Sequence, residues 1–250
     1  RYGSAGLASY AMSAVDIALW DLKGKLLKRP VYELLGGPQK SAIECYASNT
    51  DLQWGTPESI AWFLELGFRA VKVFLRDGPE AGISGVRRAE ELVASTREQV
   101  GPDVEVMVDA WISLNVEQAV RIGEAIRPYR PKWLEDYLLP EDMQGYRRVR
   151  ERLPGAVLAS GEHWYTLQPF AEAAAHGLVD ILQPDLAWCG GITAGQKVAH
   201  LAEAHGLTMI VHGGMNYPWG QHLSLAMPAI IMGERSEGVS PPGVPLEEMT

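Results

Sequence analysis

The stretch Val157-Leu-Ala-Ser-Gly-Glu-His-Trp164 decides the fold class, because it is an apolar run that ends abruptly in a carboxylate, Glu162. Two earlier apolar runs also end on an acid, one at Asp109 and the other at Glu135. The three acids are separated by 26 and 27 residues. Equal spacing at the ends of apolar runs predicts one site built from neighbouring strands.

Apolar or β-branched runs alternate with helical stretches along most of the chain. Several of the helical stretches end at a glycine, such as Gly101 or Gly206, as expected of a helix C-cap. Buried strands that alternate with helices at a steady spacing are typical of a parallel sheet covered by helices. The runs are residues 42–47, 70–75, 104–109, 132–135, 157–160, 179–183 and 208–211.

The same pattern favours a closed, TIM-like (β/α)-barrel over an open doubly wound sheet. An open sheet normally carries a Gly-rich phosphate-binding turn after its first strand, but Ser48-Asn49-Thr50 follows the first run here. A further run at 230–232 supplies an eighth strand. We therefore expect a helix and linker at 1–40, the catalytic barrel at 41–238 and a Pro-rich segment at 239–250.

The first and last segments suggest a longer parent protein. Residues 11–28 predict a helix that carries an apolar face. The chain begins at Arg1 rather than Met and ends in a Pro-rich stretch, so we expect both ends to continue elsewhere. The apolar face of the helix comprises Ala14, Ile17, Ala18 and Leu22.

Composition excludes several classes of function. A formal net charge of −9 argues against a nucleic-acid surface, which needs clustered Lys and Arg. The apolar runs are far shorter than the roughly 20 residues of a membrane span, and no secretory leader precedes them. Two cysteines cannot form a disulfide framework and fit a reducing cytosol. We expect a cytoplasmic protein without nucleic-acid or membrane partners.

The three acids predict a metal site. In a parallel barrel the carboxyl ends of the strands face a common mouth, where Asp109, Glu135 and Glu162 repel one another unless a cation lies among them. Oxygen-only ligands favour Mg²⁺ or Mn²⁺ over zinc. The alternative is that each acid caps the helix that follows it, a role that Asp136 and Asp142 also fit. The regular spacing favours the metal.

The next two strand ends predict a general base. Asp185 closes one strand, and His212 closes the next one 27 residues later. A carboxylate beside an imidazole orients it and raises its basicity. A satisfied structural histidine is the alternative for a lone residue, but the aspartate partner and the nearby acids favour the base.

Further polar and aromatic residues stand at strand ends. Lys72 is either a contact for an anionic substrate or a solvated lysine. His163 directly follows a predicted ligand, and we expect it to line the pocket. Trp111, Trp164 and Trp188 follow strand ends and either wall the pocket or pack helices on the barrel.

These motifs together resemble the enolase superfamily in its mandelate racemase branch, over almost the whole chain. Within that branch the chain is most similar to the L-rhamnonate dehydratases, in Cys45-Tyr-Ala-Ser48, Gly161-Glu-His163 and Gln183-Pro-Asp-Leu-Ala-Trp-Cys-Gly-Gly191. The resemblance is carried by Ala14-Val-Asp-Ile-Ala-Leu-Trp-Asp-Leu-Lys-Gly24, Leu34-Leu-Gly-Gly37, Val108-Asp-Ala110, Trp133-Leu-Glu135, Ser160-Gly-Glu162, Gln183-Pro-Asp185, Cys189-Gly-Gly-Ile192 and His212-Gly213.

The resemblance implies a role for each of these site residues. It implies Mg²⁺ on the three acids, His212 as base with Asp185 behind it, and a last-strand glutamate that hydrogen-bonds the developing enediolate. We assign that glutamate to Glu234, with Glu237 as the alternative. It further implies a homo-oligomer and an N-terminal capping domain that selects the substrate, and we expect that domain to lie outside this chain.

One departure from the superfamily pattern bears on the reaction. Racemases of the superfamily carry Lys-x-Lys on the second barrel strand, whereas this chain has Lys72-Val-Phe74 and so lacks the second base. One base can both remove an α-proton and protonate a β-hydroxyl leaving group. We therefore expect dehydration of a sugar acid, L-rhamnonate first, to a 2-keto-3-deoxy acid. The alternatives are another acid-sugar dehydratase, an epimerase or a catalytically silent binding barrel. The sequence of segment 215–220, which follows the base, departs from that expected of rhamnonate dehydratases, and this argues against L-rhamnonate as the substrate.

Overall fold

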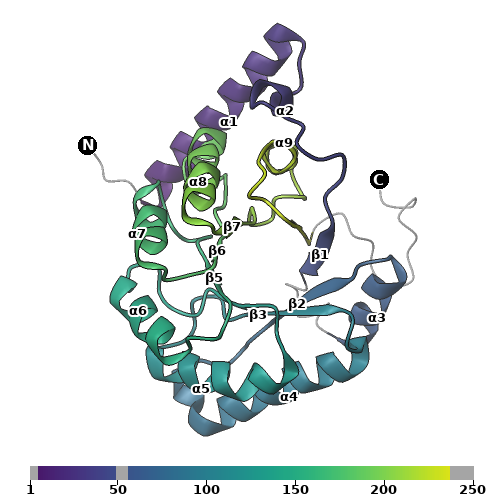
Figure 1. Ribbon diagram of the computed structural model, residues 1–250, viewed down its shortest axis with the longest axis vertical. Coiled ribbons are helices and arrows are strands. Elements are labelled where there is room, and N and C mark those ends of the chain that lie inside the picture. The colour runs from purple at the N-terminus through teal and green to yellow at the C-terminus, as the bar shows by residue number, and fades with distance from the viewer. Residues whose placement is uncertain (1–4, 49–55, 237–250) are drawn as a thin grey trace. The chain divides into compact units, whose positions relative to one another are not determined.

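The structure of the protein, a computed structural model, describes residues 5–48 and 56–236 (Figure 1). Two compact units divide the chain: the 160–234 unit, which includes residues 1–44, and the 45–159 unit, which includes residues 235–250. The strands follow the order β7-β6-β5-β4-β3-β2-β1-β8. They are β1 (Cys45–Ser48), β2 (Ala70–Phe74), β3 (Glu105–Asp109), β4 (Leu134–Glu135), β5 (Leu158–Ser160), β6 (Ile181–Leu182), β7 (Thr208–Met209) and β8 (Gly233–Arg235).

The predicted alternation of strands and helices is confirmed, with shorter strands than the sequence runs. None of the described helices combines the length and the hydropathy that a membrane span requires. The helices are α1 (Leu7–Leu27), α2 (Val31–Leu34), α3 (Pro57–Glu65), α4 (Gly82–Val100), α5 (Val116–Ile126), α6 (Met143–Arg152), α7 (Gln168–His176), α8 (Gly191–His205) and α9 (Pro218–Ala226), with 3-10 turns η1 (Pro79–Ala81) and η2 (Arg127–Tyr129).

In the 45–159 unit, parallel pairing aligns the strand ends that carry the predicted acids. Phe74 pairs with Asp109, Asp109 with Glu135, and Glu135 with Ala159. Val71, Val106 and their neighbours are fully buried, which explains why these strands are continuous apolar runs. The register therefore places the two acids in one row across adjacent strands.

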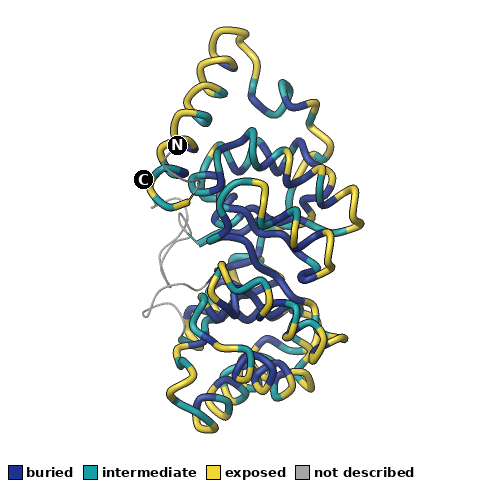
Figure 2. Tube along the Cα trace, turned by 90° about the vertical axis from the view of Figure 1, so that its left-hand side faces the viewer, coloured by how far each residue is buried: buried dark blue, intermediate teal, exposed yellow. Residues whose placement is uncertain are grey.

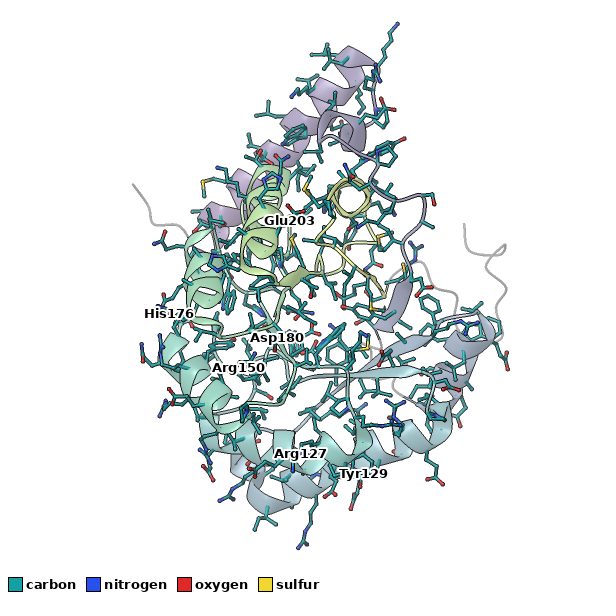
Figure 3. The ribbon with its side chains drawn as sticks, in the orientation of Figure 1. Arg127, Tyr129, Arg150, His176, Asp180 and Glu203 are labelled. Carbon is teal, nitrogen blue, oxygen red and sulfur yellow. The ribbon has the colours of Figure 1, made fainter. Side chains whose placement is uncertain are left out.

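Helices α3 to α6 belong to this unit, and α4 and α5 run side by side (Figure 1). Thr56 caps α3 by accepting from Ser59 N–H, and Pro57 occupies the first helical position. Arg127 and Tyr129 lie in the η2 turn after α5 (Figure 3), where the Tyr129 carbonyl accepts a hydrogen bond from the Arg97 guanidinium at 3.1 Å.

The 160–234 unit continues the parallel pattern from the last residue of β5. Gln183 N–H donates to the Ser160 carbonyl at 3.0 Å, and Leu182 of β6 pairs with Met209 of β7. The predicted eighth strand at 230–232 lies three residues later, at Gly233–Arg235, because Ile230 forms only an isolated bridge with Met209.

Helix α1 forms where the sequence predicts it, but its predicted apolar face does not pack. Its buried residues are Ser9, Ser13 and Gly24, and much of its length is exposed (Figure 2). The exposed apolar residues of α1 are Leu7, Met12, Val15, Leu19, Leu22, Leu26 and Leu27.

Small and polar residues of α1 pack against the start of α8 instead. Gly190 N–H donates to the Ser13 hydroxyl at 2.8 Å, and Thr193 N–H donates to the Asp16 carboxylate at 2.9 Å. A Cβ at Gly191 would overlap the Asp16 side chain. The orphan N–H groups of α8 thus find acceptors on α1, which explains why this face carries small and polar residues.

Candidate functional site

In the 45–159 unit, the Lys72 ammonium joins the two predicted metal ligands. Its Nζ lies 3.0 Å from Asp109 Oδ2 and 2.6 Å from Glu135 Oε1. All three side chains are 1% exposed. The second oxygens also have partners, since Trp111 N–H donates to Asp109 at 2.8 Å and Trp133 Nε1 donates to Glu135 at 2.7 Å. The two carboxylates are therefore fixed in place.

This cluster holds more negative charge than its lysine balances. Burial raises the pKa of Asp109, and the neighbouring Asp136 raises it further, while the Lys72 ammonium opposes both effects. Asp136 is itself 1% exposed. Buried carboxylates in excess of cations are costly unless a further positive charge binds them. The donor set consequently suits a hard divalent cation.

The helix-capping alternative does not hold for the three spaced acids. Asn115 caps α5, since its side chain accepts from Gln118 N–H, and Asp142 caps α6 by accepting from Gly145 N–H. Helix α7 has no side-chain cap. Asp109, Glu135 and Glu162 thus cap none of the helices that follow them.

In the 160–234 unit, the His212 imidazole lies between two carboxylates. Its Nδ1 is 2.8 Å from Asp185 Oδ2, and its Nε2 is 3.3 Å from Glu162 Oε2. Gly213 follows with a φ of +56°, and its N–H donates to Glu234 Oε2 at 2.7 Å. The structure thus brings together four of the predicted site residues: Glu162, Asp185 and His212 just beyond β5, β6 and β7, and Glu234 within β8.

Surrounding acids control the charge of this histidine. Burial lowers the pKa of His212, but Glu162, Asp185 and Glu234 together outweigh burial and raise it to about 10. With these carboxylates uncompensated, the imidazole holds a proton at neutral pH. A cation on Glu162 would take up part of that negative charge and lower the pKa of His212.

One aromatic side chain, that of Trp188, contacts both histidine rings. The Trp188 ring lies 5.4 Å from the His163 ring and 5.5 Å from the His212 ring, measured between centroids. His163 Nδ1 is 3.3 Å from Glu162 Oε1. Trp164 is 1% exposed and packs edge-on against Phe170. Trp188 therefore adjoins the proposed base, whereas Trp164 belongs to the packing of α7.

The remaining predicted residues differ in their surroundings. Trp111 is 65% exposed and adopts a φ of +42°, so its side chain stands in solvent. Lys72 is fully buried and is not the solvated lysine of the alternative reading. Glu237, the alternative to Glu234, lies outside the described residues. The substrate contacts assigned to Lys72, His163 and Trp111 stay predictions.

Sequence reasoning assigned no site role to two buried polar residues. Asp136 lies beside Asp109 as a buried charge rather than as a helix cap, and its φ of +44° is a conformation that no sequence pattern signalled. Gln183 is 1% exposed at the end of β6. The signal for Gln183 was a polar residue inside an apolar run, two positions before Asp185.

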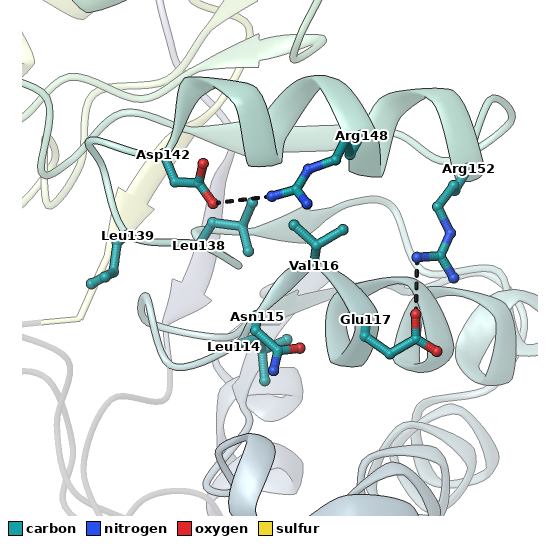
Figure 4. Close-up of a pocket in the computed structure, with 9 residues that line it drawn as sticks. All are labelled: Leu114, Asn115, Val116, Glu117, Leu138, Leu139, Asp142, Arg148 and Arg152. Carbon is teal, nitrogen blue, oxygen red and sulfur yellow. Dashed lines mark hydrogen bonds and ion pairs between the residues drawn. The ribbon is translucent and has the colours of Figure 1, made fainter.

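A separate hollow of about 410 Å³ lies between the starts of α5 and α6 (Figure 4). Its polar groups already have partners: Arg152 is 2.9 Å from Glu117, and Arg148 is 3.9 Å from Asp142. We assign no ligand to it. The lining residues are Leu114, Asn115, Val116, Glu117, Leu138, Leu139, Asp142, Arg148 and Arg152.

Comparison with known proteins identifies similar sequences and folds. Residues 58–249 match the family model described as enolase C-terminal domain-like, and residues 2–36 match the N-terminal domain of the mandelate racemase/muconate lactonizing enzymes. The chain is 43% identical over 219 residues to an L-rhamnonate dehydratase of Saccharopolyspora erythraea, covering 87% of this chain and 54% of that protein.

Two solved structures from Gibberella zeae have the same fold. One is an L-rhamnonate dehydratase, at a TM-score of 0.87 and 33% identity over 94% of this chain and 57% of that one. The other is a rhamnonate dehydratase complexed with Mg, at a TM-score of 0.87 and 34% identity. That match covers 98% of this chain and 58% of the other. The chain thus spans little more than half the length of these relatives. Their similarity identifies the eight strands as those of a (β/α)-barrel.

Proposed function

We propose that the chain is a Mg²⁺-dependent lyase. The premise is that the chain belongs to the enolase superfamily and carries mandelate racemase/muconate lactonizing enzyme domains. The reaction is dehydration of an acid sugar to a 2-keto-3-deoxy acid, with L-rhamnonate as the first substrate to test. The observation that carries this proposal is the His212–Asp185 pair, 2.8 Å apart on adjacent strand ends, with Glu162 on the other side of the ring.

The cation would be held by Asp109, Glu135 and Glu162. All three are buried carboxylates, which suits Mg²⁺ and also Mn²⁺. Pairing aligns Asp109 with Glu135 and Glu135 with Ala159, and Glu162 follows Ala159 by three residues. When bound, the cation supplies stabilisation of the negative charge that develops on the substrate carboxylate.

The protein's own groups carry the proton transfers. His212 Nε2 takes the α-proton, and Asp185 on Nδ1 holds the tautomer that leaves Nε2 able to accept it. The α C–H electron pair then forms the new double bond as the β C–O bond breaks. Protonated His212 gives its proton to the departing hydroxyl, which leaves as water, so that one residue serves both steps. The enol that results becomes the 2-keto-3-deoxy acid when its hydroxyl proton is lost and the β-carbon takes a proton from water.

Dehydration rather than racemisation is supported by the surroundings of β2. Racemisation needs a second base on the opposite face of the substrate. Phe74 cannot accept a proton, and Lys72 is held as an ammonium between Asp109 and Glu135. We propose that Lys72, His163 and Trp111 contact the substrate and that Glu234 hydrogen-bonds the charge that develops on it.

A panel of acid sugars tests the proposal. We expect Mg²⁺-dependent formation of a 2-keto-3-deoxy acid, detected as an α-keto acid, with L-rhamnonate among the substrates turned over. EDTA should abolish the reaction, and added Mg²⁺ should restore it. Turnover that survives EDTA would rule out the metal, and inversion at the α-carbon without loss of water would favour an epimerase instead.

A further inference from the structure

Gln183 closes β6 with a carboxamide that has no protein partner among the described residues. The residue is 1% exposed, and neither Oε1 nor Nε2 has a hydrogen bond to the part of the chain that the structure describes. A buried polar group left unpaired loses its hydrogen bonds to water and gains none in return, which destabilises the folded state. Buried polar groups are therefore almost always paired with protein, ordered water or ligand.

Backbone hydrogen bonds join the Gln183 segment to the end of β5 and to the proposed base. Gln183 N–H donates to Ser160 on β5 at 3.0 Å, and His212 N–H donates to the carbonyl of Pro184 at 3.1 Å. Gln183 thus lies directly after β6, two residues before Asp185, in the segment that hydrogen-bonds both to β5 and to His212.

We infer that Gln183 binds a hydroxyl oxygen at the floor of the proposed site. The oxygen belongs either to the sugar acid or to a water held beneath it. A carboxamide presents one acceptor and one donor group, and a hydroxyl satisfies both because it donates and accepts. A carboxylate would leave Oε1 unpaired, and an ammonium would leave Nε2 unpaired. The assignment of the oxygen to a sugar acid rests on the proposed function, whereas its assignment to a water molecule does not.

Gln183→Met tests the inference, since methionine keeps the unbranched length and removes the hydrogen bonds. The thermal unfolding midpoint and kcat/KM are measured for wild type and variant, with the best acid sugar and with analogues that each lack one hydroxyl. Gln118→Met is the matched control. Gln118 is 5% exposed, and its Nε2 donates to the Gly82 carbonyl at 3.2 Å, so its loss should lower the midpoint through a known partner.

Three results are distinguishable. A loss of about 10-fold in kcat/KM for the parent acid that vanishes for one deoxy analogue identifies a substrate hydroxyl. A lower unfolding midpoint with an equal loss for every analogue identifies water. The inference is overturned if the unfolding midpoint of Gln183→Met is unchanged or higher and its kcat/KM is unaltered. It is also overturned if the midpoint is unchanged or higher and neither protein turns over any acid sugar. Failure of wild type to turn over any acid sugar refutes the proposed function but leaves the midpoint comparison readable.

Discussion

His212 Nδ1 lies 2.8 Å from Asp185 Oδ2, although the two residues are separated by 27 positions in sequence. Asp185 follows β6 and His212 follows β7, and parallel pairing of these strands brings their ends together. The pair is therefore a product of the sheet register rather than of local sequence. Its chemical role is open to direct tests.

Asp185→Asn should reduce kcat by about 10²–10⁴-fold. The amide keeps the shape of the carboxylate but no longer stabilises the imidazolium or fixes its tautomer. Steady-state kinetics with the best acid sugar provide the measurement, with Asp103→Asn on the surface as control. An unchanged kcat would show that Asp185 does not act on the base.

Lys72→Met should destabilise the metal-free protein by about 3–5 kcal/mol, because it leaves the buried Asp109 and Glu135 carboxylates without their ammonium. The free energy of unfolding in EDTA measures this loss, and added Mg²⁺ should recover part of it. Lys25→Met is the matched control, since Lys25 is 74% exposed in its pair with Asp21 and should cost less than about 1 kcal/mol. Equal losses in the two variants would contradict the account.

Glu162→Gln should weaken Mg²⁺ binding by at least about 10-fold. Binding to the folded state raises the unfolding midpoint, so a Mg²⁺ titration followed by thermal unfolding reports the affinity. Glu117→Gln, which removes an exposed partner of Arg121 and Arg152, should leave the titration unchanged. A full Mg²⁺ response in Glu162→Gln would remove this residue from the ligand set.

Stability of the metal-free protein should depend on pH through His212. Its pKa is about 10 in the folded chain, above the ordinary value of about 6.5, so protonation favours the folded state. This contribution is fully present below about pH 6.5 and is lost as the pH rises through 10. The stability gap between wild type and His212→Asn, measured in EDTA, should therefore shrink from pH 6.5 to pH 10. A gap that does not vary with pH would be inconsistent with this charge state.

The sequence predicted the strand ends because their chemistry is local. Apolar runs that end on Asp109, Glu135 and Glu162 report burial and termination of a strand within a few residues of each acid. Spacing alone then indicates adjacency, since parallel strands at a constant repeat lie side by side. The same reasoning located Asp185 beside His212.

Features that depend on three-dimensional neighbours were not predictable. Lys72 is buried because β2 pairs with β3 in a register that places its ammonium on two acids. Asp136 points into the cluster through a left-handed backbone conformation. Helix α1 packs through Ser13 and Asp16 because the start of α8 needs acceptors, and an apolar periodicity cannot report that requirement.

Exchange of the α-proton tests the central claim most directly. The best acid sugar, or L-rhamnonate if none is turned over, is incubated with the protein and Mg²⁺ in D₂O, and deuterium at the α-carbon of the recovered substrate is followed by NMR. We predict Mg²⁺-dependent exchange in wild type and none in His212→Asn. Exchange at the wild-type rate in His212→Asn would show that another residue is the base.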